Sequence, residues 1–331
     1  MPDFALEEAL AQAANTKLVI TGDFALDAYW HLDPDWQETS LETGRDVQRV
    51  QRHHGGPGGA ANLACNAADL GAATSVVGLV GDDLFGRELT HLLSVFGVDT
   101  EHLLHGPMSW DTTVFAKPHR NGDELERLDF GTANQLDDSW RDRLLEVLED
   151  RCRDTSAIIW NQQIARGLWS DAQATRIAEL AKANPDCVFL QNTRDFAAPI
   201  EGTVVVCNAH EAARWNGVAT SPRDTVSPGD ALGWAEALRQ RTGRAAFVTC
   251  GRHGIALADT ATELIGARPT DADVDPVGAG DTATAAIAAV LGGGGSPRAA
   301  AQLAVLAAAV TVTKTHTTGT ASPDEIRELA S

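Results

Sequence analysis

The chain has 331 residues, of which 44% are hydrophobic, and its 26 Lys plus Arg against 46 Asp plus Glu give a formal net charge of −20. This composition is that of a globular protein and excludes general disorder, and no apolar run is long enough for a transmembrane helix. The acidic charge disfavours nucleic acid and anionic membranes as partners, because both would be repelled.

The N-terminus has acidic residues where a secretion signal has a basic region, which favours a cytoplasmic protein. Five scattered cysteines without a C-x-x-C pair predict buried thiols in a reducing compartment, not a disulfide or zinc framework. Two interpretations of the acidity stay open: adaptation to a salt-rich cytoplasm, or an ordinary solvated acidic surface.

Short apolar runs alternate with helical patterns along the whole chain. The apolar runs are predicted as strands and cover residues 17–23, 74–81, 157–160, 187–190, 204–207 and 245–249. The helical patterns cover residues 60–70, 83–96, 137–150, 168–183, 228–241, 280–291 and 297–313. This alternation predicts an α/β fold, with a doubly wound and mostly parallel sheet covered by helices on both faces.

Two segments interrupt the alternation. Residues 31–54 are polar and lack a helical stripe, and residues 111–130 have the pattern of a hairpin with a turn at Asn121-Gly122. Together they predict a small β lid beside the main sheet. Since no flexible linker or internal repeat is present, residues 1–331 are predicted to form a single domain with these two lid segments.

The segment DPVGAGDT, residues 275–282, contains the most informative motif. The small residues Gly278, Ala279 and Gly280 let the backbone approach a ligand, and the free N–H groups of the helix that follows predict an anion site. Asp281, at the start of that helix, has two interpretations from the sequence. It either caps the helix or acts as a base that takes a proton from an attacking hydroxyl group.

A second glycine-rich segment, GGPGGAAN at residues 55–62, also precedes a helix. It lacks the Gly-Lys-Ser/Thr of a Walker A loop, and it does not follow a strand as a dinucleotide-binding loop does. It is either a flexible loop or a backbone surface that binds a polyol, with Asn62 pointing toward the ligand.

Four motifs in this order resemble those of the ribokinase, or PfkB-type, carbohydrate kinase family. Residues 58–62, 70–72 and 77–86 are similar to its N-terminal signature, and residues 275–281 to its C-terminal signature D-x-x-G-A-G-D. Between them, residues 208–211 match N-x-x-E and residues 248–254 match the T-x-G-x-x-G nucleotide loop. Within the family, residues 22–30 and 127–130 most resemble the kinase domain that acts on D-glycero-D-manno-heptose 7-phosphate.

The resemblance implies ATP-dependent phosphorylation of a hydroxyl group on a sugar or sugar phosphate. Asp281 would be the general base, and the N–H groups around Gly278, Ala279 and Gly280 would stabilise charge on the phosphoryl group. The residues implied to hold sugar hydroxyls are Asp23, Asp27, Gly58, Gly59 and Asn62. Arg127 and Asp129 either face the substrate, with Arg127 binding a sugar phosphate, or form a cross-strand ion pair.

The resemblance also implies the cofactors and the assembly. Thr249, Gly251 and Gly254 would line the nucleotide, while Asn208 and Glu211 would act on Mg²⁺ mainly through ordered water. Asp275 and the loop near Thr318-Gly319 would help bind a monovalent cation such as K⁺. A homodimer formed through the lid is expected.

Two amides, Gln163 and Asn192, stand where the heptose 7-phosphate kinases have acids. Besides a heptose 7-phosphate-like substrate, two alternatives therefore stay open. One is a kinase of the same family for another sugar, a sugar acid or a nucleoside. The other is a catalytically weak regulatory protein that binds a sugar or nucleotide, although the intact Gly-Ala-Gly-Asp sequence favours an active kinase.

Overall fold

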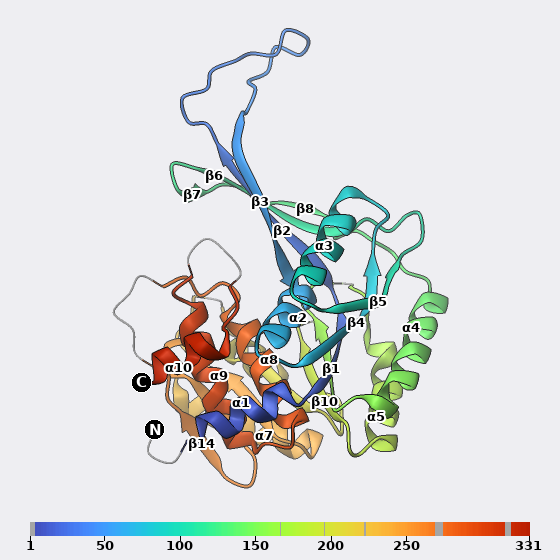
Figure 1. Ribbon diagram of the computed structural model, residues 1–331, viewed down its shortest axis with the longest axis vertical. Helices are drawn as coiled ribbons and strands as arrows, with labels where there is room; N and C mark the ends of the chain where they lie inside the picture. Colours follow the sequence, from blue (N-terminus) through green and yellow to red (C-terminus); the bar gives the residue numbers. More distant parts are fainter. Residues whose placement is uncertain (1–3, 166, 195, 222, 269–273, 315–318) are drawn as a thin grey trace.

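The computed structural model describes residues 4–165, 167–194, 196–221, 223–268, 274–314 and 319–331. In this part of the chain the strands form two sheets, a large one in the body of the molecule and a small one that projects from it (Figure 1). The large sheet has the strand order β14-β13-β12-β11-β10-β9-β1-β4-β5.

The large sheet is mostly parallel, as predicted. Its strands are β1 (Lys17–Gly22), β4 (Ala73–Val80), β5 (Asp99–His105), β9 (Ala157–Gln162), β10 (Val188–Thr193), β11 (Val204–Asn208), β12 (Ala246–Thr249), β13 (Ile255–Ala258) and β14 (Thr262–Ile265). Every pairing from β5 across to β12 is parallel, and only β13 and β14 at one edge are antiparallel. Apolar runs suit these central strands because both sheet faces are covered.

Helices cover both faces of the large sheet. They are α1 (Leu6–Ala14), α2 (Ala60–Asp69), α3 (Leu84–Val95), α4 (Asp138–Arg151), α5 (Ala174–Ala183), α6 (Ala209–Trp215), α7 (Pro228–Thr242), α8 (Ala279–Gly292), α9 (Pro297–Thr311) and α10 (Pro323–Ala330). Side chains of β1 alternate between the two faces of the sheet. Leu18 and Ile20 belong to the apolar cluster that contains α2, α8 and α9, and Val19 belongs to the cluster that contains α4 and α5. The doubly wound arrangement is therefore confirmed.

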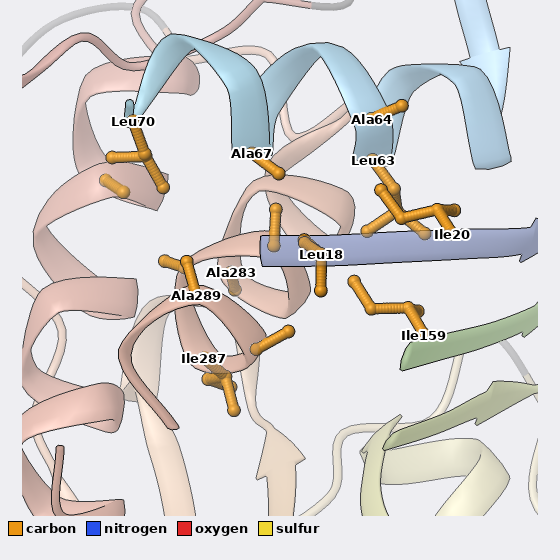
Figure 2. Close-up of a cluster of buried hydrophobic side chains, with 14 of the residues drawn as sticks. Leu18, Ile20, Leu63, Ala64, Ala67, Leu70, Ile159, Ala283, Ile287 and Ala289 are labelled. Atoms are coloured by element: carbon orange, nitrogen blue, oxygen red, sulfur yellow. The ribbon is translucent and has the colours of Figure 1, made fainter. Parts of the chain in front are cut away.

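Helix α8 is buried along nearly its whole length. Its alanines and Ile287 lie in one apolar cluster with Leu18 of β1 and Leu63 of α2 (Figure 2). Small side chains allow α8 to pack closely against its neighbours, and such a core resists deformation. Any group at the N-terminus of α8 is consequently held on a rigid support.

The small sheet contains the predicted hairpin together with two strands that precede it in the chain. Its strands are β2 (Phe24–Leu32), β3 (Val50–Gly59), β6 (Thr113–Arg120), β7 (Asp123–Glu124) and β8 (Leu128–Phe130), in the order β3-β2-β6-β7 with β8 beside β6. The turn at Asn121-Gly122 is confirmed, with positive φ angles of 55° and 91°.

The small sheet also begins earlier in the chain than the predicted lid segments. In β2, Leu26 and Ala28 pack into the core, and the intervening Asp27 and Tyr29 lie on the opposite face. This alternation carries the strand back to Phe24, whereas the prediction placed the first lid segment at residue 31.

Several elements were not predicted, namely α1, β5, α6, β13, β14 and α10. The helix expected over 168–183 is shorter and starts with a 3₁₀ turn at Asp171–Gln173 before α5. All five cysteines are free thiols. Within the described ranges, no helix combines the length and apolar character needed to cross a membrane.

Candidate active site

Asp281 lies in the first turn of α8, and the N-cap of this helix is Gly278, in a left-handed conformation with φ 82°. A positive φ is readily adopted only by glycine, so the turn into the helix depends on this residue. The Asp281 carboxylate reaches across to α2, where Asn62 Nδ2 donates to its Oδ2 at 2.8 Å. The helix-capping interpretation of Asp281 therefore does not describe its main contact.

The pKa of Asp281 is raised to about 6, principally because burial disfavours the charged carboxylate. The hydrogen bond from Asn62 and the positive charge of Arg194 oppose this rise, and the negative charges of Asp27 and Glu211 reinforce it. These three charges lie in β2, in α6 and directly after β10, so the fold brings them to one site. A pKa of about 6 leaves the group ionised at neutral pH but more basic than an ordinary aspartate.

Asp27, in the middle of β2, is buried beside a lysine of the neighbouring strand. Its Oδ2 lies 3.1 Å from Lys117 Nζ, and the two side chains are 7% and 12% exposed. Burial raises the pKa of Asp27, although the Lys117 charge opposes the rise. Lys117 Nζ also lies 3.4 Å from the Tyr29 hydroxyl oxygen, so the lysine is held between two partners.

Gly58 and Gly59 end β3 next to this pair. A Cβ atom on Gly58 would lie 3.3 Å from the Asp27 carboxylate, and one on Gly59 would lie 2.5 Å from the carbonyl oxygen of Asp23. Gly59 also has a positive φ of 54°. The neighbouring Asp23 and Asp27 thus make glycine necessary at position 59 and favour a small residue at position 58, before any ligand is considered.

Asp23 uses its carboxylate to hold a neighbouring loop. Its Oδ2 accepts the N–H groups of Gln163 at 3.0 Å and Ile164 at 2.9 Å, and its Oδ1 accepts that of Leu168 at 2.9 Å. Such charge-assisted bonds fix Gln163, Ile164 and Leu168 against the end of β1. A direct bond from Asp23 to a sugar would have to share these oxygens, and this role stays a prediction.

Arg127 and Asp129 pair with each other at the beginning of β8. Arg127 Nε and Nη2 donate to the two carboxylate oxygens at 2.6 and 2.8 Å, and the guanidinium lies 4.5 Å from the Phe115 ring centre. The pair joins residues two positions apart, so it is not the cross-strand pair considered from the sequence. Both side chains are partly exposed.

Asn208 and Glu211 form a capping box at the start of α6. Asn208 Oδ1 accepts the Glu211 N–H and Glu211 Oε2 accepts the Asn208 N–H, both at 2.9 Å. Glu211 Oε1 accepts a hydrogen bond from Arg194 Nε at 3.1 Å. Sequence reasoning missed Arg194, although its position directly after β10 could have indicated it, because parallel strands end at the same edge of the sheet.

A pocket of about 930 Å³ adjoins this edge of the sheet. Its lining includes Asn208, Thr249, Gly251, Gly254, Ala279 and Gly280. Apolar residues of α9 and the residue after it, among them Ala304, Val305, Ala308 and Val312, form another wall. The fold thus places the predicted nucleotide loop and the N-terminus of α8 around one cavity.

Asp275 is tied to its own loop next to α8. Its N–H donates to the Val312 carbonyl at 2.8 Å, and its Oδ1 accepts the N–H of Val277 at 3.0 Å. Thr318, in the loop that the prediction also assigned to the cation site, lies outside the described residues.

The two amides that depart from the heptose kinase pattern contact each other. Gln163 Nε2 and Asn161 Nδ2 donate to Asn192 Oδ1 at 2.8 and 2.9 Å, and Asn192 Nδ2 donates to the Val206 carbonyl at 2.9 Å. Asn161 and Asn192 are buried. Amide groups both donate and accept, so they form these bonds in a way that ionised acids could not, although Asn161 Oδ1 has no hydrogen-bond partner in the described part of the chain.

The pfkB family of carbohydrate kinases matches residues 23–325 of the chain. The chain belongs to this family. The predictions of a PfkB-type family member, of a ribokinase-like fold and of a carbohydrate kinase are thereby confirmed.

Curated relatives are bacterial proteins named bifunctional protein HldE. The protein of Gluconobacter oxydans is 29% identical over 319 residues, with 95% of this chain and 64% of the relative covered. That of Azorhizobium caulinodans is 32% identical over 319 residues, with 93% and 63% covered. This chain therefore spans less than two thirds of the length of these relatives.

Solved structures of ribokinases share the fold. Ribokinase of Arabidopsis thaliana, complexed with ribose and ATP, has a TM-score of 0.71 at 18% identity, covering 95% of this chain and 98% of that one. Ribokinase of Cryptococcus neoformans, in complex with ADP, has a TM-score of 0.70 at 16% identity, covering 95% and 99%.

Proposed function

We propose that this kinase transfers the terminal phosphoryl group of ATP to a hydroxyl group of a sugar or sugar phosphate, with Asp281 as the general base. The position of Asp281 carries the proposal. On one side, Gly280 lines the 930 Å³ pocket, and on the other the carboxylate bonds to Asn62 at 2.8 Å. A base between the two binding regions can take the hydroxyl proton as the oxygen attacks phosphorus.

The nucleotide is assigned to the pocket. Its apolar wall on α9 suits an adenine ring, and Thr249, Gly251 and Gly254 offer backbone groups along the opposite side. The phosphates would lie toward the N-terminus of α8, where the N–H groups around Gly278, Ala279 and Gly280 stabilise anionic oxygens. These donors are fixed in place before reaction, because α8 is buried in the core.

The sugar is assigned to the space between the lid and α2. Asp27 and Asn62 are its polar contacts, with Gly58 leaving room beside Asp27. Arg127 would bind a phosphate already present on the substrate, exchanging part of its pairing with Asp129. A heptose 7-phosphate-like substrate fits this arrangement, and the similarity to HldE proteins supports it.

Mg²⁺ fits the site as an ion held mainly by nucleotide phosphates and water. In the described part of the chain, no three His, Cys, Asp or Glu side chains lie close enough to hold a metal together. Asn208 and Glu211 would bind its water ligands, and the ion would neutralise charge on the phosphates. Asp275 is proposed to contribute to a monovalent cation site.

The lid is proposed to join two copies of the chain. It carries large apolar side chains that are at least 38% exposed, namely Trp36, Leu41, Val50, Leu125, Leu128 and Phe130. In Figure 1 the lid and its tip, residues 33–49, extend away from the body. Light scattering after gel filtration tests the dimer, and Leu128→Glu should favour the monomer if the lid forms the contact.

The kinase proposal is tested by ATP consumption with Mg²⁺ over a panel of free sugars, sugar phosphates, sugar acids and nucleosides. The assay is run at low and at molar KCl, with Asp281→Asn as the control. One acceptor with Asp281-dependent turnover supports the proposal and identifies the substrate. Thermal stabilisation by ligands without turnover would instead support the regulatory binding protein.

A further inference from the structure

A row of buried polar side chains lies behind Asn62. Asn62 and Asn66 on α2, Thr282 on α8 and Thr311 on α9 each have an exposed fraction of 0%. Asn66, Thr282 and Thr311 are not among the residues that line the described nucleotide pocket. Buried polar groups are costly unless they are hydrogen-bonded, so these four side chains are expected to bond to one another or to the backbone.

The donors of Thr282, Asn66 and Asn62 point in one direction, toward Asp281. Asn66 Nδ2 donates to Asn62 Oδ1 at 3.1 Å, which leaves Asn62 Nδ2 turned toward Asp281. Thr282 Oγ1 lies 2.7 Å from Asn66 Oδ1, an acceptor, so the Thr282 hydroxyl is the donor. Its one proton is then used, so Thr282 can only accept from Thr311 Oγ1, 3.0 Å away, and the Thr311 hydroxyl has the Ala307 carbonyl at 3.2 Å as a second acceptor. The chain of bonds ends at the Asp281 carboxylate.

We propose that Asn66 and Thr282 are positioning residues that hold the Asn62 amide with its NH₂ group against the Asp281 carboxylate. The torsion that orients an amide is soft, so without Asn66 the amide could rotate and place its oxygen beside the carboxylate. Successive hydrogen bonds in a buried setting also strengthen one another. This inference rests on the proposed function, in which Asp281 is the base.

The physical consequence concerns the ionisation of Asp281. Burial raises its pKa, and the bond from Asn62 is the first of the effects that lower it again. Loss of that bond raises the pKa further, so less of the base is ionised at a given pH. The row of donors therefore preserves the active form of the base near neutral pH.

The test uses four variants of the full chain. Thr282→Val keeps the shape but removes the donor, and Thr282→Ser restores the hydroxyl. Asn66→Leu removes the amide that orients Asn62. Thr16→Val is the matched control, because the Thr16 hydroxyl is equally buried and bonds to α8 at the Ala289 carbonyl, eight residues from Asp281.

Two readouts are compared, the pH dependence of kcat and the pH titration of the Asp281 carboxyl carbon by ¹³C NMR, assigned by difference from Asp281→Asn. In Asn66→Leu, the midpoints of the kcat profile and of the Asp281 titration should both move to higher pH by about one unit. On the acidic side of both midpoints, kcat should be about tenfold lower than in the wild type. Thr282→Val should move them by about half as much. Thr282→Ser and Thr16→Val should leave both in place, even where Thr16→Val lowers the melting temperature.

Unchanged titration of Asp281 in both Asn66→Leu and Thr282→Val would overturn the inference, and lower stability alone would then make these residues purely structural. An equal shift in Thr16→Val would overturn it as well. The NMR titration needs no turnover. An inactive wild-type protein would therefore refute the proposed function, while the carboxyl titration would still decide whether the hydrogen-bond chain controls Asp281.

Discussion

The two sides of the proposed site hold their charged groups in different ways. On the side of the large sheet, Asp281 accepts a hydrogen bond from the Asn62 amide, and Glu211 accepts the Asn208 N–H as well as pairing with Arg194. On the lid, the proposed substrate ligands have charged side chains as partners, Asp27 with Lys117 and Arg127 with Asp129. In the proposed function the base Asp281, held by a neutral amide, is ready for reaction, whereas the lid groups exchange charged partners when a substrate binds.

This difference separates the chemical step from substrate recognition. Groups held in the core can stabilise a transition state without reorganising. In the proposed function, groups on the lid lose one partner as they gain another, so we expect them to determine which substrate binds and to contribute less to the rate. Substitutions on the core side should lower kcat, and substitutions on the lid side should mainly raise KM.

The largest effect is expected for Asp281→Asn. The amide cannot accept the hydroxyl proton, so kcat should fall by about 10²- to 10⁴-fold. KM for the sugar should change little, because Asn62 and Asp27 remain. Steady-state kinetics with the substrate found in the panel measures both values, and turnover close to that of the wild type would exclude Asp281 as the base.

The same variant should be more stable than the wild type at alkaline pH. The pKa of Asp281 is raised to about 6 in the folded state by burial, above its value in the unfolded chain. The folded protein therefore retains a proton that the unfolded chain has lost, and stability falls as the pH rises from about 4 to 6. Thermal unfolding of Asp281→Asn should lack this fall in stability with rising pH. A general folding defect of the variant would not remove the pH dependence.

The sequence predicted the core side of the site better than the lid. Small residues followed by a helical pattern placed the start of α8 within one residue, because these local signals coincide with the structure. Lys117 was not predicted to pair with Asp27, since 90 positions separate them and the pairing depends on the register of β2 against β6. Asp23 was predicted as a sugar ligand, but its bonds to the N–H groups of Gln163, Ile164 and Leu168 depend on a distant loop.

The next largest effect is expected on the lid, from Asp27→Asn. Loss of a charged acceptor should raise KM for the sugar by about 10- to 100-fold, with a much smaller change in kcat. Asp33→Asn is the matched control, because Asp33 lies on the lid with a looser partner, Arg49, at 3.8 Å. A fall in kcat at unchanged KM would show that the lid acts in the chemical step and would remove the distinction between the two sides.

A moderate effect on stability is expected at the amide network of the large sheet. In Asn192→Asp, the donor to the Val206 carbonyl is lost and a buried carboxylate faces that oxygen. The free energy of unfolding should fall by about 1–3 kcal/mol at neutral pH. Urea unfolding measures it, with Gln163→Glu as the comparison at a less buried position. Equal stability of Asn192→Asp and the wild type would mean that the amides are not needed for the fold.

The smallest effect on stability is expected for Arg127→Gln, and this variant distinguishes substrate classes most directly. An exposed ion pair contributes little, so the free energy of unfolding should change by less than about 0.5 kcal/mol. If Arg127 exchanges Asp129 for a substrate phosphate, KM for the phosphorylated acceptor should rise about tenfold, while KM for its unphosphorylated form should stay within about twofold. Asp129→Asn gives the opposite test, because freeing Arg127 should lower KM for the phosphorylated acceptor alone. Equal changes for both acceptors would assign the pair to the structure of the lid and leave recognition of the sugar to Asp27 and Asn62.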